Sequence, residues 1–151
     1  MRPLKQFDDY LKEGIVKRIS KDRERAKSLI KESERKMRSL KVQLEKVGIY
    51  EDNANDYVEY CYDALMNLVR AKLYFKGYAA SGHGAHEAEV AYLRELGFTE
   101  NDVQFANQLR FFRNGILYYG TSIDKEYAEQ ALKFIKKAQP KVRAAIKIDT
   151  A

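Results

Sequence analysis

Residues 20–48 read SKDRERAKSLIKESERKMRSLKVQLEKVG, and apolar side chains return at every third or fourth position along them. Residues three and four apart lie on the same face of a helix, so this spacing predicts one helix with a single buried stripe. Ser20 is placed to cap its first turn and Gly48 to end it. The stripe consists of Ala26, Leu29, Ile30, Ser33, Met37, Leu40, Leu44 and Val47.

Four further segments show the same periodicity. They lie at about 56–76, 87–96 and 100–119, and in a stretch that begins after Ser122 or Asp124. Thr99 is expected to cap the third of these, and Pro140 is expected to end or kink the last. Residues 4–18 show a weaker amphipathic pattern, and no segment alternates with period two. The sequence therefore predicts an all-α fold, an antiparallel bundle of four to five helices with a short extra N-terminal helix and no strands.

Length and composition limit the class of protein. A chain of 151 residues suits one domain, with residues 1–21 as an N-terminal extension and 22–151 as the helical bundle. There is neither an apolar run long enough to span a bilayer nor a signal-peptide pattern behind Arg2. The single cysteine, Cys61, cannot form an internal disulfide. These features predict a cytoplasmic protein without membrane partners.

Positive charge is concentrated in residues 17–46, which hold twelve Lys or Arg residues and five acidic ones. The whole chain carries a net charge of only +6, so the remainder is close to neutral. A helix of this kind can face nucleic acid or another polyanion. It can equally be a solvated face whose charges interleave.

Histidine is the scarcest reactive residue type, and both copies lie in one glycine-rich loop. His83 and His86 are three positions apart and Glu87 follows, but the spacing supplies no further ligand for a metal ion. No metal and no cofactor are therefore predicted. The loop can cap the helix that follows or lie over a functional groove. Cys61 belongs to a buried stripe and is expected to be a core residue.

The segment QLRFFRNGILYYG at residues 108–120 contains the most candidate functional residues. Helical spacing places Arg110, Asn114, Leu117 and Tyr118 close to one face. Gly115 costs about 1 kcal/mol relative to alanine inside a helix, which predicts close approach of another backbone there, within the bundle or across a dimer. An alternative for the arginines is pairing with Asp63 or Glu59 of the preceding long helix.

Together with YDAL at residues 62–65 and AKLYFKGY at 71–78, this segment resembles the HEPN superfamily of small helical bundles. The resemblance covers about residues 22–146 and is strongest to an archaeal branch whose motif helix ends in Arg-Asn, three residues, and Tyr-Tyr-Gly. It implies a homodimer whose motif helices face each other. HEPN ribonucleases place an Arg, a polar residue and a later His in a composite RNA-cleaving groove.

In this chain Arg113 and Asn114 match that motif, but Tyr118 stands where the histidine is expected. Tyrosine titrates near pH 10 and histidine near 6.5, so Tyr118 is a poor proton acceptor at neutral pH. The resemblance thus implies an RNA- or nucleotide-binding dimer that does not cleave. Its expected ligand-binding residues are Arg110, Arg113, Asn114, Tyr118 and Tyr119, with Asp63, His83 and His86 as groove support.

Two alternatives remain open. One is a metal-independent endoribonuclease in which Arg113, Asn114 and Tyr118 are catalytic, with Tyr118 or Tyr119 standing in for histidine. The other is a toxin–antitoxin component that acts with a minimal nucleotidyltransferase, for which Tyr118 or Tyr119 would accept the nucleotide.

Overall fold

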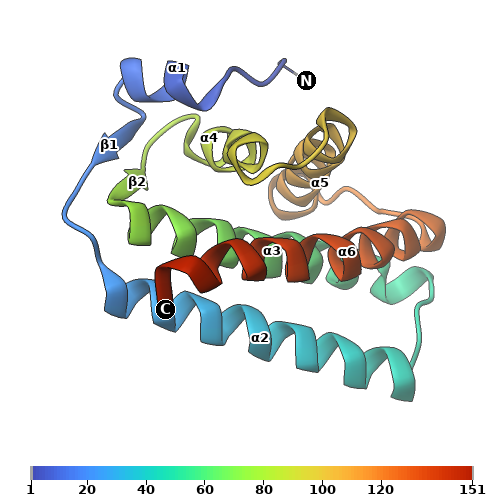
Figure 1. Cartoon of the computed structure of the whole chain (residues 1–151). Coiled ribbons are helices and arrows are strands. Elements are labelled where there is room, and N and C mark those ends of the chain that lie inside the picture. Colours follow the sequence, from blue (N-terminus) through green and yellow to red (C-terminus); the bar gives the residue numbers. More distant parts are fainter. Residues whose placement is uncertain (1, 151) are drawn as a thin grey trace.

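The structure, a computed structural model, describes residues 2–150 and contains an all-α bundle (Figure 1). Met1 and Ala151, the outer ends of the predicted segments 1–21 and 22–151, lie outside the described residues. The predicted fold class is confirmed. The elements are α1 (Phe7–Lys12), β1 (Val16–Arg18), α2 (Arg23–Lys46), η1 (Glu51–Asn53), α3 (Ala54–Lys76), β2 (Tyr78–Ala80), α4 (Ala85–Ala91), η2 (Tyr92–Leu96), α5 (Glu100–Tyr119) and α6 (Lys125–Thr150).

Helix α3 forms the centre of the molecule. It packs against α2, α6, α5 and α4, and nearly all of its residues between Tyr57 and Phe75 are buried. In Figure 1, α2 lies on one side of α3 and α6, and α4 and α5 lie on the other. Cys61 is fully buried here, as predicted, and burial raises the pKa of its thiol to about 12.

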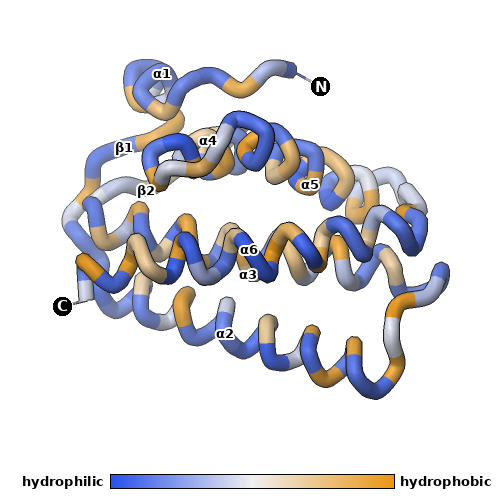
Figure 2. Tube along the Cα trace, turned by 45° about the vertical axis from the view of Figure 1, so that its right-hand side comes forward, coloured by the Kyte–Doolittle hydropathy of each residue, from blue (hydrophilic) through white to orange (hydrophobic). Residues whose placement is uncertain are grey.

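Helix α2 shows the predicted periodicity, and Figure 2 shows apolar residues recurring regularly among hydrophilic ones along it. The last residue of the predicted stripe is wrong, because Val47 follows the end of the helix and is exposed. Its cap is Asp22, not Ser20, because the Asp22 carboxylate accepts a hydrogen bond from the Arg25 backbone N–H at 3.0 Å. Thr99 caps α5 as predicted, accepting from the Asp102 N–H at 3.2 Å.

The prediction that the chain has no strands is wrong. Strands β1 and β2 pair antiparallel, with Val16 opposite Ala80 and Arg18 opposite Tyr78. Each strand has three residues, which is too short for alternation to appear in the sequence. The pairing ties the segment before α2 to the end of α3.

The N-terminal segment also contributes to the core. Leu4, Phe7, Tyr10 and Val16 are all buried, and the Phe7 ring centroid lies 4.7 Å from that of Tyr92. Helix α1 packs against α4. The segment is thus held by apolar contacts as well as by the strand pair.

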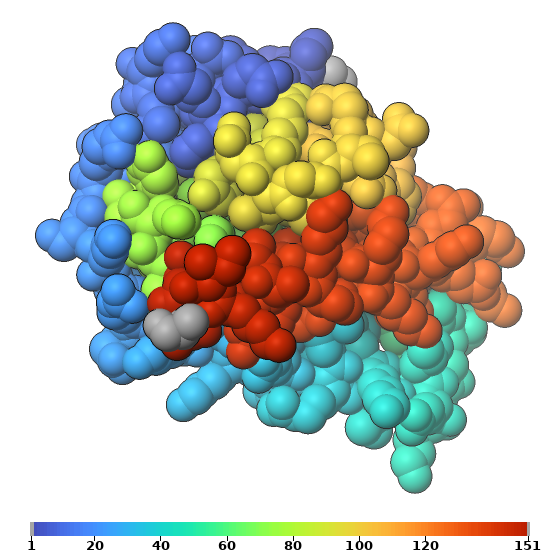
Figure 3. Space-filling model, in the orientation of Figure 1, coloured from blue at the N-terminus to red at the C-terminus, as the bar shows by residue number. Residues whose placement is uncertain are grey.

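The expected break at Pro140 is also wrong, because α6 continues from Lys125 to Thr150. Proline removes a single backbone hydrogen bond, and Pro140 is exposed, where its ring meets solvent. Ala138 and Val142 on either side are buried, so packing holds the helix through the proline. Figure 3 shows α6 covering the face between α2 and the segment around α4. No helix within residues 2–150 is long and apolar enough to cross a membrane.

Candidate functional site

The second half of α5, the loop before α4 and the chain's first residues enclose a pocket of about 550 Å³. Helical spacing predicts Arg110, Asn114, Leu117 and Tyr118 on one face of the helix. The structure brings all of these except Leu117 to this pocket, together with Tyr119. The residues that line it are Arg2, His83, Glu87, Arg110, Phe111, Phe112, Asn114, Gly115, Tyr118, Tyr119 and Thr121.

Arg110 is the buried cation of the pocket, with 8% of its surface exposed. Its Nε donates to the Asn107 side-chain oxygen at 2.8 Å, and a terminal nitrogen lies 3.8 Å from Glu87 Oε1. Within residues 2–150 its other N–H groups make no hydrogen bond. The guanidinium is therefore held in a fixed orientation with donors left for an anion.

A second cation, Arg2, reaches the same pocket from the segment before α1. One of its terminal nitrogens lies 3.4 Å from Glu87 Oε1 and donates to His83 Nε2 at 3.1 Å. In this arrangement the Nε2 atom of His83 is the acceptor, because guanidinium nitrogens only donate. His83 therefore lines the pocket, whereas Asp63 and His86, the other residues expected to support the groove, do not. Arg2 was missed, because no local pattern links it to residues more than eighty positions away.

Arg113 points to another part of the molecule. A terminal nitrogen lies 3.2 Å from Asp63 Oδ1 on α3, and the guanidinium carbon lies 5.9 Å from the Tyr62 ring centroid. Among residues 2–150, its buried Nε has no hydrogen-bond partner. This is the pairing with Asp63 that the sequence left open as an alternative. Neither Arg113 nor Asp63 lines the pocket.

His86 also lies away from the pocket lining and contacts Glu89 instead, with 3.2 Å between Nδ1 and Oε1. Arg70 donates two hydrogen bonds to the same buried carboxylate, at 2.6 and 2.9 Å. Burial alone raises the pKa of Glu89, but the hydrogen bonds from Arg70 and His86 outweigh it and hold the pKa below its usual value. The two histidines therefore lie in different surroundings, His83 at the pocket and His86 beside Glu89. In the described part of the chain no three His, Cys, Asp or Glu residues gather as metal ligands.

Gly115 makes the predicted close approach, but its neighbour is a side chain of the same chain and not another backbone. A Cβ atom at Gly115 would lie 2.8 Å from Thr121 Oγ1. The Thr121 N–H also donates to the Gly115 carbonyl at 3.2 Å. The glycine therefore lets the connection between α5 and α6 fold back against the helix and close one wall of the pocket.

The last turns of α5 leave large apolar side chains in solvent. Tyr118 is 74% and Tyr119 is 86% exposed, and Phe111 and Leu117 are nearly half exposed. We refer to these four residues as the α5 tip. An apolar cluster of this kind beside a pocket is typical of a binding surface.

Compared with family models, with curated proteins and with solved structures, the chain matches none of them. The resemblance to the HEPN superfamily therefore stays a prediction from its own residues at 62–78 and 108–120.

Proposed function

We propose that this chain is a HEPN-like homodimer that binds RNA or a nucleotide in the pocket beside the α5 tip. The observation that carries the proposal is that Arg110, Asn114, Tyr118 and Tyr119 line one pocket with the cation of Arg2. Guanidinium groups bind phosphate oxygens as paired donors, and tyrosine rings offer stacking faces to bases. The pocket thus combines the two chemistries that a nucleotide requires.

The α5 tip supports the dimer. Phe111, Leu117 and Tyr119 leave apolar surface in water that a second copy would cover, while Tyr118 stays free for a base. A two-fold axis at this helix brings the two pockets side by side, and a single RNA strand then contacts both.

A second candidate function is metal-independent RNA cleavage, and the position of His83 favours it. The motif histidine is replaced by Tyr118, but His83 enters the same pocket from the loop before α4. To accept the proton of an attacking ribose 2′-hydroxyl, His83 Nε2 has to exchange its hydrogen bond from Arg2 for one from the substrate. In this reading His83 supplies the proton transfer that Tyr118 cannot.

Binding is tested by fluorescence anisotropy with a fluorescein-labelled single-stranded RNA of about 12 nucleotides, near the site size of common single-strand binders. Arg110→Gln and Tyr118→Ala are each expected to weaken binding about tenfold or more, because one removes a phosphate donor and the other a stacking face. Arg113→Gln, three positions further along α5, is the matched control and should retain binding because Arg113 faces Asp63. Loss of binding in Arg113→Gln with no loss in Arg110→Gln would contradict this pocket as the ligand site.

Cleavage is measured on the same RNA by gel electrophoresis in excess EDTA. Products formed by the native chain and lost in His83→Gln would support the second candidate. Intact RNA with the native chain, at concentrations where it is bound, supports binding without cleavage. The same assay on Tyr118→His then tests whether a proton-transfer group at this position is enough to give RNA cleavage.

A further inference from the structure

A groove on a different face of the molecule has no role in the proposed function. Helices α2 and α6 run antiparallel and both pack on α3. They contact each other directly at the middle of α2, where Arg143 Nε donates to Glu34 Oε1 at 3.0 Å. Beyond this ion pair, towards the end of α2 and the start of α6, two adjoining hollows separate them, with volumes of about 470 and 440 Å³.

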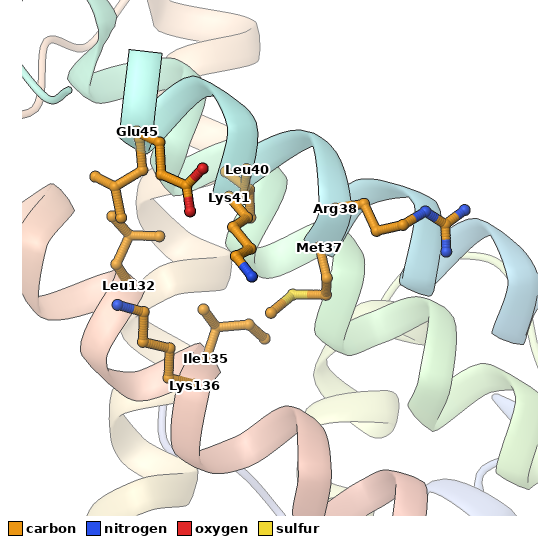
Figure 4. A pocket seen from close by; sticks show the side chains of 9 residues that line it. Met37, Arg38, Leu40, Lys41, Glu45, Leu132, Ile135 and Lys136 are labelled. Carbon is orange, nitrogen blue, oxygen red and sulfur yellow. The ribbon is translucent and has the colours of Figure 1, made fainter. Parts of the chain in front are cut away.

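The floor of this groove is apolar. Met37, Leu40 and Leu44 come from α2, Leu132 and Ile135 from α6, and Ile49 from the loop after α2. Figure 4 shows Met37 reaching from α2 towards α6 and Ile135 reaching towards it from the other side. Met37, Leu44 and Ile49 are only half-buried, so the second half of the α2 stripe is incompletely covered.

The rim of the groove is positively charged. Four lysines lie along it, Lys41 on α2 and Lys125, Lys133 and Lys136 on α6, against two acids, Glu45 and Glu129. None of the four has a carboxylate within 4.0 Å among residues 2–150. Other lysines of the same helices do, such as Lys36 with Glu32 and Lys137 with Asp102. The groove therefore carries unneutralised charge beside an apolar floor.

We infer that this groove is the docking site for an amphipathic helix of a partner protein whose flanks are acidic. From Lys125 to Lys136 the groove extends about 16 Å, the rise of three helical turns. A helix laid between α2 and α6 buries apolar residues at three- and four-residue steps on the floor. Its flanking carboxylates then face the rim lysines, which fix its orientation and speed its approach.

Other occupants fit the groove less well. The residues that line it include no aromatic ring on which a nucleic-acid base could stack. A second copy using the same face would bring lysines against lysines, because a two-fold interface pairs each patch with itself. Charge and shape together favour a separate, acidic helix.

The test uses the full chain and a fluorescein-labelled peptide of about 14 residues, roughly four turns, with leucine at three- and four-residue steps and glutamate on both flanks. A second peptide of identical composition and scrambled order shares its charge but not its apolar face. We expect measurable anisotropy with the first peptide and binding at least about tenfold weaker with the second. Equal binding of the two, or none of the first, would overturn the inference.

Site specificity is tested with Lys133→Glu combined with Lys136→Glu, both on the exposed rim. Binding of the amphipathic peptide should fall about tenfold or more and recover in part when its glutamates are replaced by lysines. Lys31→Glu combined with Lys147→Glu is the matched control, since it makes the same change of charge outside the groove, with one position on α2 and one on α6. An equal loss of peptide binding in the Lys31/Lys147 double variant would show non-specific charge attraction. Self-association of the native chain that the Lys133/Lys136 double variant abolishes would show that a second copy occupies the groove. Either result overturns the inference.

Discussion

Arg110 and Arg113 lie one helical turn apart on α5 and serve different parts of the molecule. Arg110 is turned towards Glu87 and the pocket, whereas Arg113 is turned towards Asp63 and Tyr62 on α3. A difference of three positions rotates a side chain by about 60° around the helix, and this is enough to separate a ligand donor from a structural contact. Arg113, the arginine that the resemblance to the HEPN superfamily singles out, is thus the one that connects α5 to α3.

Removing Arg113 is therefore expected to lower stability. Arg113→Ala leaves Asp63 unpaired in a partly buried position, at a cost of about 1–3 kcal/mol in the free energy of unfolding. Urea denaturation of Arg113→Ala, Asp63→Ala and the double variant measures the interaction between them. If the two single effects simply add, the pair contributes nothing and the contact is incidental.

For single residues, helical spacing in the sequence predicts which face of a helix a side chain occupies but not which residue or ligand that side chain contacts. Helical spacing alone placed Arg110, Asn114 and Tyr118 on one side of α5, and the pocket contains all three. The same spacing could not choose between a ligand and Asp63 for Arg113, because both were compatible with its position. Arg2 could not be found at all, since its approach to His83 depends on how the whole N-terminal segment packs.

The helices behave as their apolar periodicity predicts except where a neighbouring element supplies a contact. Pro140 does not interrupt α6 because buried residues on both sides keep it packed on α3. Strands β1 and β2 form although neither shows alternation, because each completes the hydrogen bonds of the other. Local propensity is overridden in both cases by contacts between segments far apart in sequence.

The end of α5 offers a test of one such contact. Gly115→Ala gains about 1 kcal/mol of helix propensity, but its Cβ would meet Thr121 Oγ1 at 2.8 Å. We expect Gly115→Ala to lower the melting temperature of the native chain and to be neutral or stabilising when Thr121→Ala is present. Thermal unfolding followed by circular dichroism measures all three variants. A melting temperature that rises in the Gly115→Ala single variant would show that Thr121 moves aside freely.

At the scale of the whole molecule, the exposed residues of the α5 tip bear on the oligomeric state. Because four large side chains there are partly or largely in water, we expect a homodimer at micromolar concentration, with twice the 17.6 kDa mass of the chain. Multi-angle light scattering measures this mass directly. Leu117→Lys combined with Tyr119→Lys should give a folded monomer, since like charges would meet across the two-fold axis.

Ile148→Lys is the control for the dimer, because Ile148 is comparably exposed but lies at the far end of α6. It should leave the dimer intact. A clean monomer of the native chain, or a dimer that survives lysines in the α5 tip, would contradict this interface.

The pairing of β1 with β2 also has a consequence for the order in which parts of the chain can fold while it is being synthesised. In a nascent chain Val16 leaves the ribosome about 3–13 s before Ala80, at translation rates of roughly 5–20 residues per second. During that interval β1 has no strand to join, and α1 has no α4 to pack on. Phe7 and Tyr10 therefore cannot reach their buried positions until α4 has been made, after α2 and the whole of α3. The segment before α2 is thus among the last parts of the bundle to reach its place.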